Sequence, residues 1–272
     1  MILQSSSSFR RSKNMKNKDE EIALIVNSHQ SSEDIWPAFI GEYHFFGWER
    51  VFSHVYILTS APPKVLPPLS GSDIQIIEYD PNLPYNLQYL SCIKRIRQNV
   101  VAIANEDCIP CGPPNEQECL RCIAILMDEK NRLSFIKLVR GEETIYKTPY
   151  ESLYEIDPAS HMYFTQQVSF WKKKDLLDVY AMSPTSYIGR KGGLQQEEVG
   201  SEICRAQRLK GYLYYNGESK RGLYHYDTTI LPHICTAIIG GRWNTHEYNQ
   251  EVRAIAERYR INLQLRGFYE GN

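Results

Sequence analysis

An excess of charge of one sign is missing from this sequence. Its 272 residues include 31 lysines and arginines and 32 aspartates and glutamates, which gives a formal net charge of −1 at pH 7. Nucleic acids and anionic membranes attract proteins through a basic field, and no local basic patch replaces the absent overall one. The composition therefore predicts no nucleic-acid partner.

Long apolar runs are missing as well. No stretch approaches the roughly 20 residues that span a bilayer, and the first residues lack the hydrophobic core of a signal peptide. The seven cysteines, an odd number, fit reduced thiols better than a disulfide framework. We therefore expect a cytoplasmic protein without a transmembrane segment, and peripheral attachment to the inner face of the membrane stays open.

What the sequence does contain is the composition of a folded globular protein, with 42% hydrophobic and 23% charged residues. Residues 1–20 are rich in serine and basic residues and have too little apolar surface to order themselves, so we expect a flexible tail. Residues 21–272 are expected to form a single domain. Within it, the proline-rich residues 61–68 predict an extended connection.

Apolar strands alternate with helical patterns from residue 22 onward, which predicts an α/β fold with a mostly parallel sheet and right-handed crossovers. The later part changes character, with alternating polar and aromatic residues that predict a half-exposed strand over 161–170. Gly192 and Gly193 interrupt the chain before a predicted helix. The expected strands are 22–26, 55–58, 74–77, 99–104 and 133–139, and the expected helices are 34–43, 87–97, 115–129, 195–210 and 246–260.

The most informative local feature is a pair of acids at the end of an apolar run. Glu106 and Asp107 follow residues 99–104, which have the composition of a strand buried on both faces. In an α/β sheet the carboxyl end of such a strand opens into the ligand crevice. Carboxylates rarely tolerate that place without a partner, and a divalent cation that carries a diphosphate is a natural one. The alternative is a solvated loop with two surface acids.

Four cysteines form two C-x2-C pairs, so a structural zinc site must be weighed. Cys108 and Cys111 are separated by only seven residues from Cys119 and Cys122, fewer than the usual interval. The second pair also lies within the predicted helix 115–129, in the apolar stripe formed by Leu120, Ile123, Leu126 and Met127. Buried cysteine behaves as a small hydrophobic residue. The pattern favours core packing over zinc.

Several segments, in order, resemble a family of bacterial glycosyltransferase-like proteins with the GT-A nucleotide-sugar-binding fold, associated with surface polysaccharide synthesis. The resemblance spans residues 21–268. The first β-α-β unit of that family is similar to residues 22–26, 32–39 and 55–60, and its acidic helix-strand segment to residues 90–107. Its Gln-to-Trp segment, its second acidic segment and its Gly-basic-Trp turn are similar to residues 166–177, 197–201 and 240–244.

The resemblance implies a GT-A-like fold, with a nucleotide-sugar-binding half over 21–140 and an acceptor-side half over 141–272. It also implies a Mn²⁺ or Mg²⁺ ion held by Asp107, with Glu106 beside it or on the sugar. Asn27 and Ser28 would touch the nucleotide at the end of the first strand. The sequence departs from the family in having Asn27 rather than an aspartate there, and Glu106-Asp107-Cys108 rather than Asp-X-Asp.

The remaining roles fall in the second half. Glu198 and Glu202 are four residues apart and share one side of the predicted helix, so Glu198 is the preferred general base and Glu197 the competing one. Arg242 is expected on a phosphate, and Trp243 either on a sugar or as an anchor for the last helix, which the pattern favours. The acceptor side is expected to include Gln167, Trp171 and Glu202.

Three hypotheses follow. The leading one is a hexosyltransferase-like glycosyltransferase that moves a sugar from a nucleotide-sugar donor to a carbohydrate or lipid-linked acceptor. The second is a catalytically inactive protein of the same fold that binds a nucleotide sugar or a glycan. The third is a zinc-stabilised interaction module built on the cysteine pairs.

Overall fold

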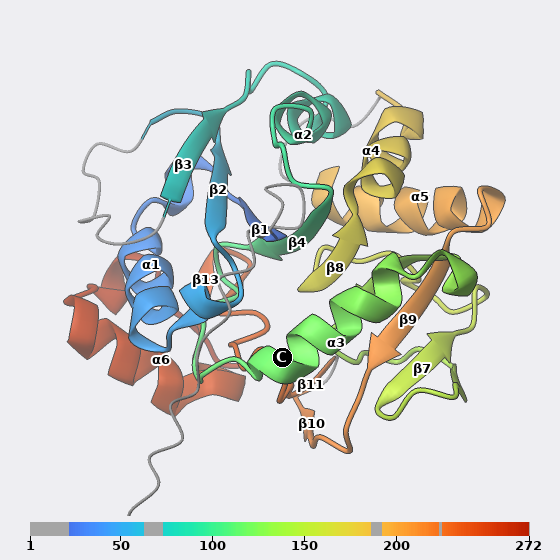
Figure 1. Ribbon diagram of the computed structural model, residues 1–272. Coiled ribbons are helices and arrows are strands. Elements are labelled where there is room, and N and C mark those ends of the chain that lie inside the picture. The colour runs from blue at the N-terminus through green and yellow to red at the C-terminus, as the bar shows by residue number, and fades with distance from the viewer. Residues whose placement is uncertain (1–21, 63–72, 186–191, 223–224, 272) are drawn as a thin grey trace, which may run out of the picture.

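The computed structural model describes residues 22–62, 73–185, 192–222 and 225–271. Within these residues, nine strands form one central sheet (Figure 1). The parallel strands β3, β2, β1 and β4 form one half, and β8 runs antiparallel between β4 and β5. In order across the sheet the strands are β3 (Asp73–Glu78), β2 (His54–Thr59), β1 (Ile22–Asn27), β4 (Val100–Asn105), β8 (Ser169–Lys172), β5 (Leu133–Lys137), β9 (Lys210–Tyr214), β7 (Leu153–Ile156) and β6 (Ile145–Lys147).

The rest of the sheet is mixed, because β9 is parallel to β5 whereas β7 and β6 are antiparallel to their neighbours. The predicted α/β architecture, a mostly parallel sheet with a mixed second half, is confirmed.

Buried apolar strands place the functional end of the sheet. Five of the six residues of β1 and of β4 are buried, as is typical of parallel strands covered on both faces. The two strands are neighbours, and Asn27 at the end of β1 is in register with Asn105 at the end of β4. The carboxyl ends of these strands therefore finish side by side.

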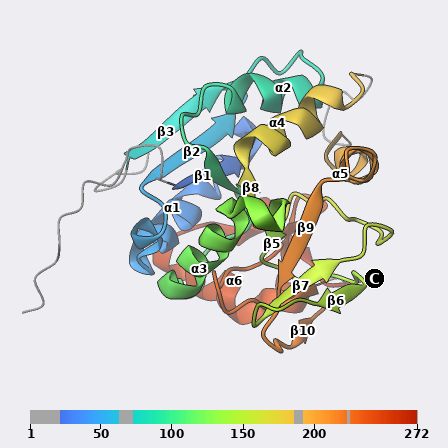
Figure 2. The same cartoon turned by 45° about the vertical axis from the view of Figure 1, so that its right-hand side comes forward.

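Helices cover both faces of the sheet (Figures 1 and 2). Side chains alternate along a strand, so Ala23 and Ile25 pack on one face whereas Leu24 and Val26 pack on the other. The first face carries α2 (Tyr85–Ile93), α4 (Lys173–Met182) and α5 (Gly192–Ala206), and the second carries α1 (Trp36–Phe45) and α3 (Glu116–Met127).

The C-terminal residues form a small layer beside α1. Gly240 and Gly241 join two of its strands with φ angles of 57° and 82°, the conformation that a two-residue hairpin turn requires. The following helix is capped by Asn244, whose side chain accepts a hydrogen bond from the Glu247 N–H at 3.2 Å. The elements are β12 (Ile238–Ile239), β13 (Arg242–Asn244), α6 (Thr245–Tyr259) and β14 (Phe268–Tyr269), and β10 (Lys220–Arg221) pairs separately with β11 (His225–Tyr226).

One prediction for the second half is wrong, and another is confirmed with shifted bounds. Residues 161–168 form turns and bends rather than a half-exposed strand, and only β8 follows. Most of this segment is buried, and its Phe164 packs on α5 at Gly200. The helix predicted over 195–210 begins at Gly192 and ends at Ala206. Its last predicted residue, Lys210, instead begins β9.

Two predicted segments lie outside the described residues. The first is the expected tail over 1–20. The second is the proline-rich connection over 61–68, of which only residues 61 and 62 are described. Among the helices that the structure describes, none has the length and apolar character needed to cross a membrane.

Candidate functional site

A cavity of about 410 Å³ opens at the carboxyl ends of β1 and β4. Its lining combines Asn27 and Ser28 from the end of β1 with Asn105, Glu106 and Asp107 from the end of β4. Further lining residues come from the β3–α2 connection, from α2, from Gln166 and from the C-terminal layer. The volume lies in the range of roughly 300–1,000 Å³ that is typical of small-ligand sites. We call this cavity the strand-end pocket.

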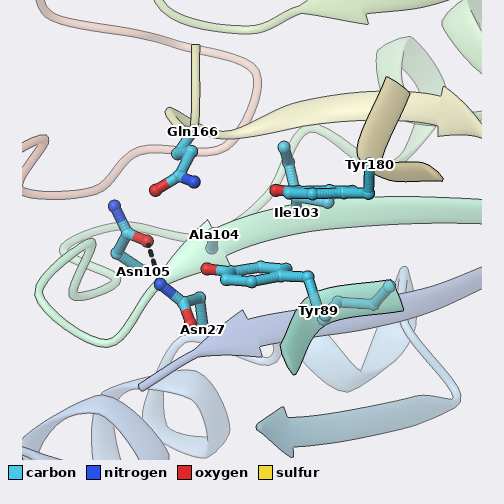
Figure 3. A pocket seen from close by; sticks show the side chains of 8 residues that line it. Asn27, Tyr89, Ile103, Ala104, Asn105, Gln166 and Tyr180 are labelled. Carbon is cyan, nitrogen blue, oxygen red and sulfur yellow. Dashed lines mark hydrogen bonds between the residues drawn. The ribbon is translucent and has the colours of Figure 1, made fainter. Parts of the chain in front are cut away.

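Two asparagines join the strands at the floor of the pocket. Asn27 Nδ2 donates to Asn105 Oδ1 at 3.2 Å (Figure 3) and also lies 3.4 Å from the Tyr85 hydroxyl. Ser28, the next residue, is held by the Trp36 indole, whose Nε1 donates to Ser28 Oγ at 2.8 Å. These side chains are therefore fixed by their neighbours before any ligand arrives.

The predicted acidic pair lies in this pocket. The Glu106 N–H donates to the Asn27 carbonyl at 3.1 Å, so the chain stays beside β1 as it leaves β4. Asp107 Oδ2 accepts from the Ile238 N–H at 3.3 Å. Burial raises the pKa of both carboxyl groups, and the charge of Glu106 raises the pKa of Asp107 further. Two neighbouring carboxylates with restricted hydration favour a divalent cation between them and an anionic ligand.

Arg266 brings positive charge to the same pocket. It follows the 3-10 turn Leu263–Leu265 and is the one guanidinium among the described residues that line the cavity. Its Nε donates to Asp34 Oδ2 at 2.7 Å, and its Nη2 donates to the Ser31 carbonyl at 2.9 Å. The charge of Arg266 lowers the pKa of Glu106 and of Asp107 and so opposes the effect of their burial.

A chain of hydrogen bonds forms the wall on the side of α2 and α5. The Tyr85 hydroxyl lies 2.9 Å from Gln166 Oε1 and donates to it, and the Gln166 N–H donates to Glu197 Oε1 at 2.7 Å. Burial raises the pKa of Glu197, whereas the hydrogen bond from Gln166 lowers it. Glu197 therefore stands directly behind a residue that lines the pocket.

The structure brings together only some of the predicted site residues. Asn27, Ser28, Glu106 and Asp107 line the strand-end pocket. Glu198 and Glu202 are exposed on α5, because the turn of the helix that directs Glu197 inward directs these two outward. Arg242 is exposed on β13 and is absent from the lining, although the preceding Gly241 contributes to it.

Trp243, predicted to bind the donor sugar or to anchor the last helix, and the predicted acceptor-side residues Trp171 and Gln167 also lie away from the lining. Trp243 is 1% exposed and packs in a cluster that includes Val252 of α6. That is the anchoring position that the sequence pattern favours. Trp171 is buried on β8, with its ring centroid 4.4 Å from that of Phe135. Gln167 is half-buried, and its Oε1 lies 4.0 Å from Cys108 Sγ.

The second of the two cysteine pairs lies in the hydrophobic core. Cys119 and Cys122 are fully buried in the core with Leu126, which confirms the packing prediction for this pair. The predicted stripe is wrong at two positions, since Leu120 and Met127 are 53% and 42% exposed. Within the described ranges, no group of three or more histidines, cysteines, aspartates or glutamates could hold a metal ion.

The sequence and the structure of the chain were compared with those of known proteins. No family model and no curated protein matches the sequence. The crystal structure of S. aureus TarS, residues 1–349, matches over 92% of this chain and 67% of that chain, with a TM-score of 0.50 and 10% identity. The fold is GT-A-like.

Two other structures superpose less closely on the GT-A-like chain. CMP:2-keto-3-deoxy-manno-octonic acid synthetase complexed with CTP has a TM-score of 0.49 and 9% identity, over 88% of this chain and 99% of that one. The mannosyltransferase PcManGT from Pyrobaculum calidifontis, in complex with GDP-Man and Mn²⁺, has a TM-score of 0.45 and 12% identity, over 74% of this chain and 58% of that one. At such identities a likeness shows the fold alone.

Three of the residues that line the strand-end pocket and that sequence reasoning missed are important for its geometry. Tyr85 and Gln166 reach the pocket from α2 and from an irregular segment, and Arg266 reaches it from near the C-terminus. Gln166 adjoins Gln167, so the sequence segment that led to the prediction of Gln167 also contains the residue that lines the pocket. Arg266 carries no local signal, because its role depends on a contact with Asp34 across 232 positions.

Proposed function

We propose that the protein is a glycosyltransferase that moves a sugar from a nucleotide-sugar donor to a carbohydrate or lipid-linked acceptor in surface polysaccharide synthesis. One observation carries the proposal: Glu106, Asp107 and Arg266 line the strand-end pocket of a GT-A-like fold. Ligands of open α/β sheets bind at the carboxyl ends of the strands. The pocket therefore combines the expected place with the charges that a diphosphate and its cation require.

The donor set fits Mn²⁺ or Mg²⁺. Both ions prefer oxygen ligands, and Mg²⁺ sites commonly combine one or two carboxylates with phosphate oxygens and water. Asp107 would hold the ion, with Glu106 beside it, and burial of both acids favours a bound cation. When bound, the cation supplies charge neutralisation for the departing nucleotide diphosphate. Asp107 and Glu106 would hold that cation at the carboxyl end of β4, where both line the pocket.

Arg266 takes the phosphate role that the sequence suggested for Arg242. A guanidinium has five N–H donors in a planar fork, and two of its nitrogens in Arg266 contact Asp34 and Ser31. The donors that remain can bind a phosphate at the pocket wall. The ion pair with Asp34 holds the guanidinium in place and limits the loss of side-chain freedom on binding.

The general base is proposed to be Glu197 rather than Glu198. A general base needs a pKa near the working pH and a position within reach of the acceptor hydroxyl. The pKa of Glu197 is raised by burial, and its charge also raises the pKa of the pocket residue Tyr85, so the carboxylate lies near the wall. Glu198 is exposed on the other side of α5.

Binding of donor nucleotides tests the proposal. Isothermal titration of GDP-, UDP-, CMP- and dTDP-sugars with Mn²⁺ is expected to show binding by the wild-type protein and by Asp178→Asn, an exposed position on α4. Asp107→Asn is expected to lose the Mn²⁺-dependent part of that binding. The titrations are repeated with Mg²⁺. If no nucleotide sugar binds in the presence of Mn²⁺ or of Mg²⁺, and none is slowly hydrolysed, the proposal is wrong.

A catalytically inactive binding protein of the same fold is the second candidate. It is favoured by the engagement of the Glu197 carboxylate with the Gln166 N–H, which leaves that group less free to accept a proton. Slow hydrolysis of the bound donor distinguishes the two candidates. An enzyme loses hydrolysis in Asp107→Asn, whereas an inactive binder has none to lose in the wild-type protein.

A further inference from the structure

Arg140 lies at the same edge of the sheet as the strand-end pocket. Strands β4 and β5 are both antiparallel to β8, so both of them end at this edge. In the register of the three strands, Ser169 of β8 is opposite Ile103 of β4 and Lys137 of β5. Arg140 comes shortly after the end of β5. It therefore lies two strands away from β4 along the carboxyl edge.

Two tyrosine rings hold the Arg140 guanidinium. Its Cζ lies 4.3 Å from the centroid of the Tyr215 ring and 4.8 Å from that of the Tyr226 ring, distances at which a cation is attracted to an aromatic face. The two rings meet edge to face, with centroids 5.6 Å apart and planes at 79°. The Tyr226 N–H also donates to the Arg140 carbonyl at 2.9 Å. We call these three residues the aromatic corner.

The aromatic corner joins the two halves of the chain. Tyr215 follows β9 directly, and Tyr226 belongs to β11. Figures 1 and 2 show β10, the partner strand of β11, just beyond the arrowhead of β9. Both tyrosines come from the half of the sequence that the family resemblance assigns to the acceptor. The corner therefore places a fixed cation on that side of the carboxyl edge.

Arg140 has no acid partner in the part of the chain that the structure describes. Its side chain is half-buried, and its Nε is buried without a hydrogen-bond partner. The cations of the adjoining segments, in contrast, are each paired with an acid: Lys137 with Glu143, Lys220 with Glu142, and Arg221 with Asp227. Charges that are shielded from water are normally paired. An anionic ligand is therefore the natural partner of this guanidinium.

A short segment connects the aromatic corner to the acidic pair of the strand-end pocket. Cys235 Sγ lies 3.8 Å from the Tyr226 carbonyl. A little further along the chain, the Ile238 N–H donates to Asp107 Oδ2, and Ile238 also lines the pocket. Residues 235–238 thus contact the corner at one end and the pocket at the other. The two sites are neighbours along the carboxyl edge.

We propose that Arg140 binds an anionic group of the acceptor, a phosphate or a carboxylate. The inference rests on the proposed transferase function and names the acceptor class, since an acidic acceptor would be preferred to a neutral glycan. A guanidinium matches planar oxyanions with parallel hydrogen bonds. Because Nε is buried, the two terminal nitrogens would make those bonds. The tyrosine rings would keep the fork in one orientation before the acceptor arrives.

NMR titration of the full chain without a divalent cation tests the proposal. The probes are glucose 6-phosphate, glucuronic acid and glucose, which differ at C6 alone. We expect the two acidic probes to bind about 10-fold more tightly than glucose, or better, and to shift the amide signals of Arg140, Tyr215 and Tyr226. The tighter of the two shows whether the subsite fits a phosphate or a carboxylate. Shifts confined to the strand-end pocket, or no binding of either acidic probe, overturn the proposal.

The substitution Arg140→Met removes the charge and keeps a chain that packs well against aromatic rings. It is expected to weaken binding of the acidic probes by about 10-fold or more. Arg97→Met is the matched control, because Arg97 is exposed and precedes β4 at the opposite edge of the sheet. If Arg140→Met binds the acidic probes as tightly as Arg97→Met does, Arg140 only supports the fold and the proposal is wrong, whatever the melting temperature of the variant.

Donor binding separates this inference from the proposed function. A protein that binds a nucleotide sugar but gives no shift at Arg140 refutes the anion subsite alone. A protein that binds the acidic probes at Arg140 but binds no nucleotide sugar refutes the assignment of the subsite to an acceptor. Both kinds of binding in the wild-type protein, with weaker binding of the acidic probes in Arg140→Met, support the inference.

Discussion

Arg266 and Asp34 form a two-point ion pair across 232 positions of the chain, with Arg266 Nε donating to Asp34 Oδ2 at 2.7 Å. The pair connects the C-terminal layer to the segment that follows β1, at the strand-end pocket. The Arg266 side chain is 13% exposed and that of Asp34 is 38% exposed, so the contact is shielded from solvent mainly on the side of the arginine. The last part of the sequence is therefore needed to complete a pocket that the first strand begins.

The first prediction concerns the two arginines near the pocket. Arg266→Ala is expected to weaken binding of a nucleotide diphosphate by about 10-fold or more, because a charge-assisted hydrogen bond to phosphate is lost. It is expected to strengthen binding of Mn²⁺ alone, because Arg266 repels a cation at Glu106 and Asp107. Calorimetric titration of each ligand measures both effects.

Arg242→Ala is the matched control for that experiment. Arg242 is exposed and does not line the pocket, so both affinities are expected to stay at the wild-type values. A larger loss of nucleotide binding in Arg242→Ala than in Arg266→Ala would restore the assignment suggested by the sequence.

The second prediction separates the two adjacent glutamates of α5. Glu197→Gln is expected to lower kcat by a factor of about 10² or more, since general base catalysis commonly contributes 10²–10⁴-fold. Glu198→Gln is expected to change kcat less than twofold, because Glu198 is exposed. Rates measured from pH 5 to 9 check the assignment.

The alternative role of Glu197 has a different signature. If it only positions Gln166 through the hydrogen bond to its N–H, Glu197→Gln raises KM and leaves the acid limb of the pH profile in place. Loss of that limb together with kcat identifies a base.

The parallel half of the fold could be predicted from the sequence because its signals are local. The apolar runs of β1, β2 and β4 are short, are bounded by polar residues, and have no helical period. The second half could not be predicted equally well. Residues 163–166 and 168 are buried without forming a strand, with Phe164 packed against Gly200 of α5, so their alternating pattern reflects tertiary packing that the sequence does not show.

Some residues of the candidate site could likewise be predicted from the sequence, and others could not. Glu106 and Asp107 could be placed because a carboxyl end of a buried strand has a known position in an α/β sheet. The choice between Glu197 and Glu198 could not be made, since it depends on a rotation of about 100° around an α-helix whose contacts were unknown. Arg266 could not be found, because only the folded chain brings it to Asp34.

The third prediction concerns the support beneath Ser28. The Trp36 indole donates to Ser28 Oγ at 2.8 Å in a buried setting, so Ser28→Ala leaves a buried N–H without a partner. We expect a loss of about 1–3 kcal/mol in the free energy of unfolding. Urea denaturation followed by tryptophan fluorescence measures it.

Ser91→Ala provides the comparison for Ser28→Ala. Ser91 is exposed on α2, where its hydroxyl donates to the Gln88 carbonyl at 2.7 Å. The expected change is within about 0.5 kcal/mol. Equal losses in the two variants would contradict the importance of the buried indole bond.

The fourth prediction concerns acid stability and His233. This side chain is 3% exposed and contacts the Leu231 carbonyl through Nδ1 at 2.6 Å. Burial lowers the pKa of His233 from 6.5 to about 4. Between these values the unfolded chain binds a proton that the folded chain does not, so the free energy of unfolding falls as the pH falls from 6.5 to 4. His233 should account for on the order of 3 kcal/mol of that fall.

Replacement by an uncharged donor isolates this contribution. His233→Asn retains an N–H group for the Leu231 carbonyl but cannot become protonated, so its stability should fall less than that of the wild-type protein between pH 6.5 and 4. His161→Asn, at an exposed position, should keep the wild-type fall. Urea denaturation at four pH values from 4 to 7.5 measures all three proteins, and parallel curves for the wild-type protein and His233→Asn would contradict the prediction. His225, whose pKa is also lowered by burial, is present in all three, so the difference between the curves reports on His233.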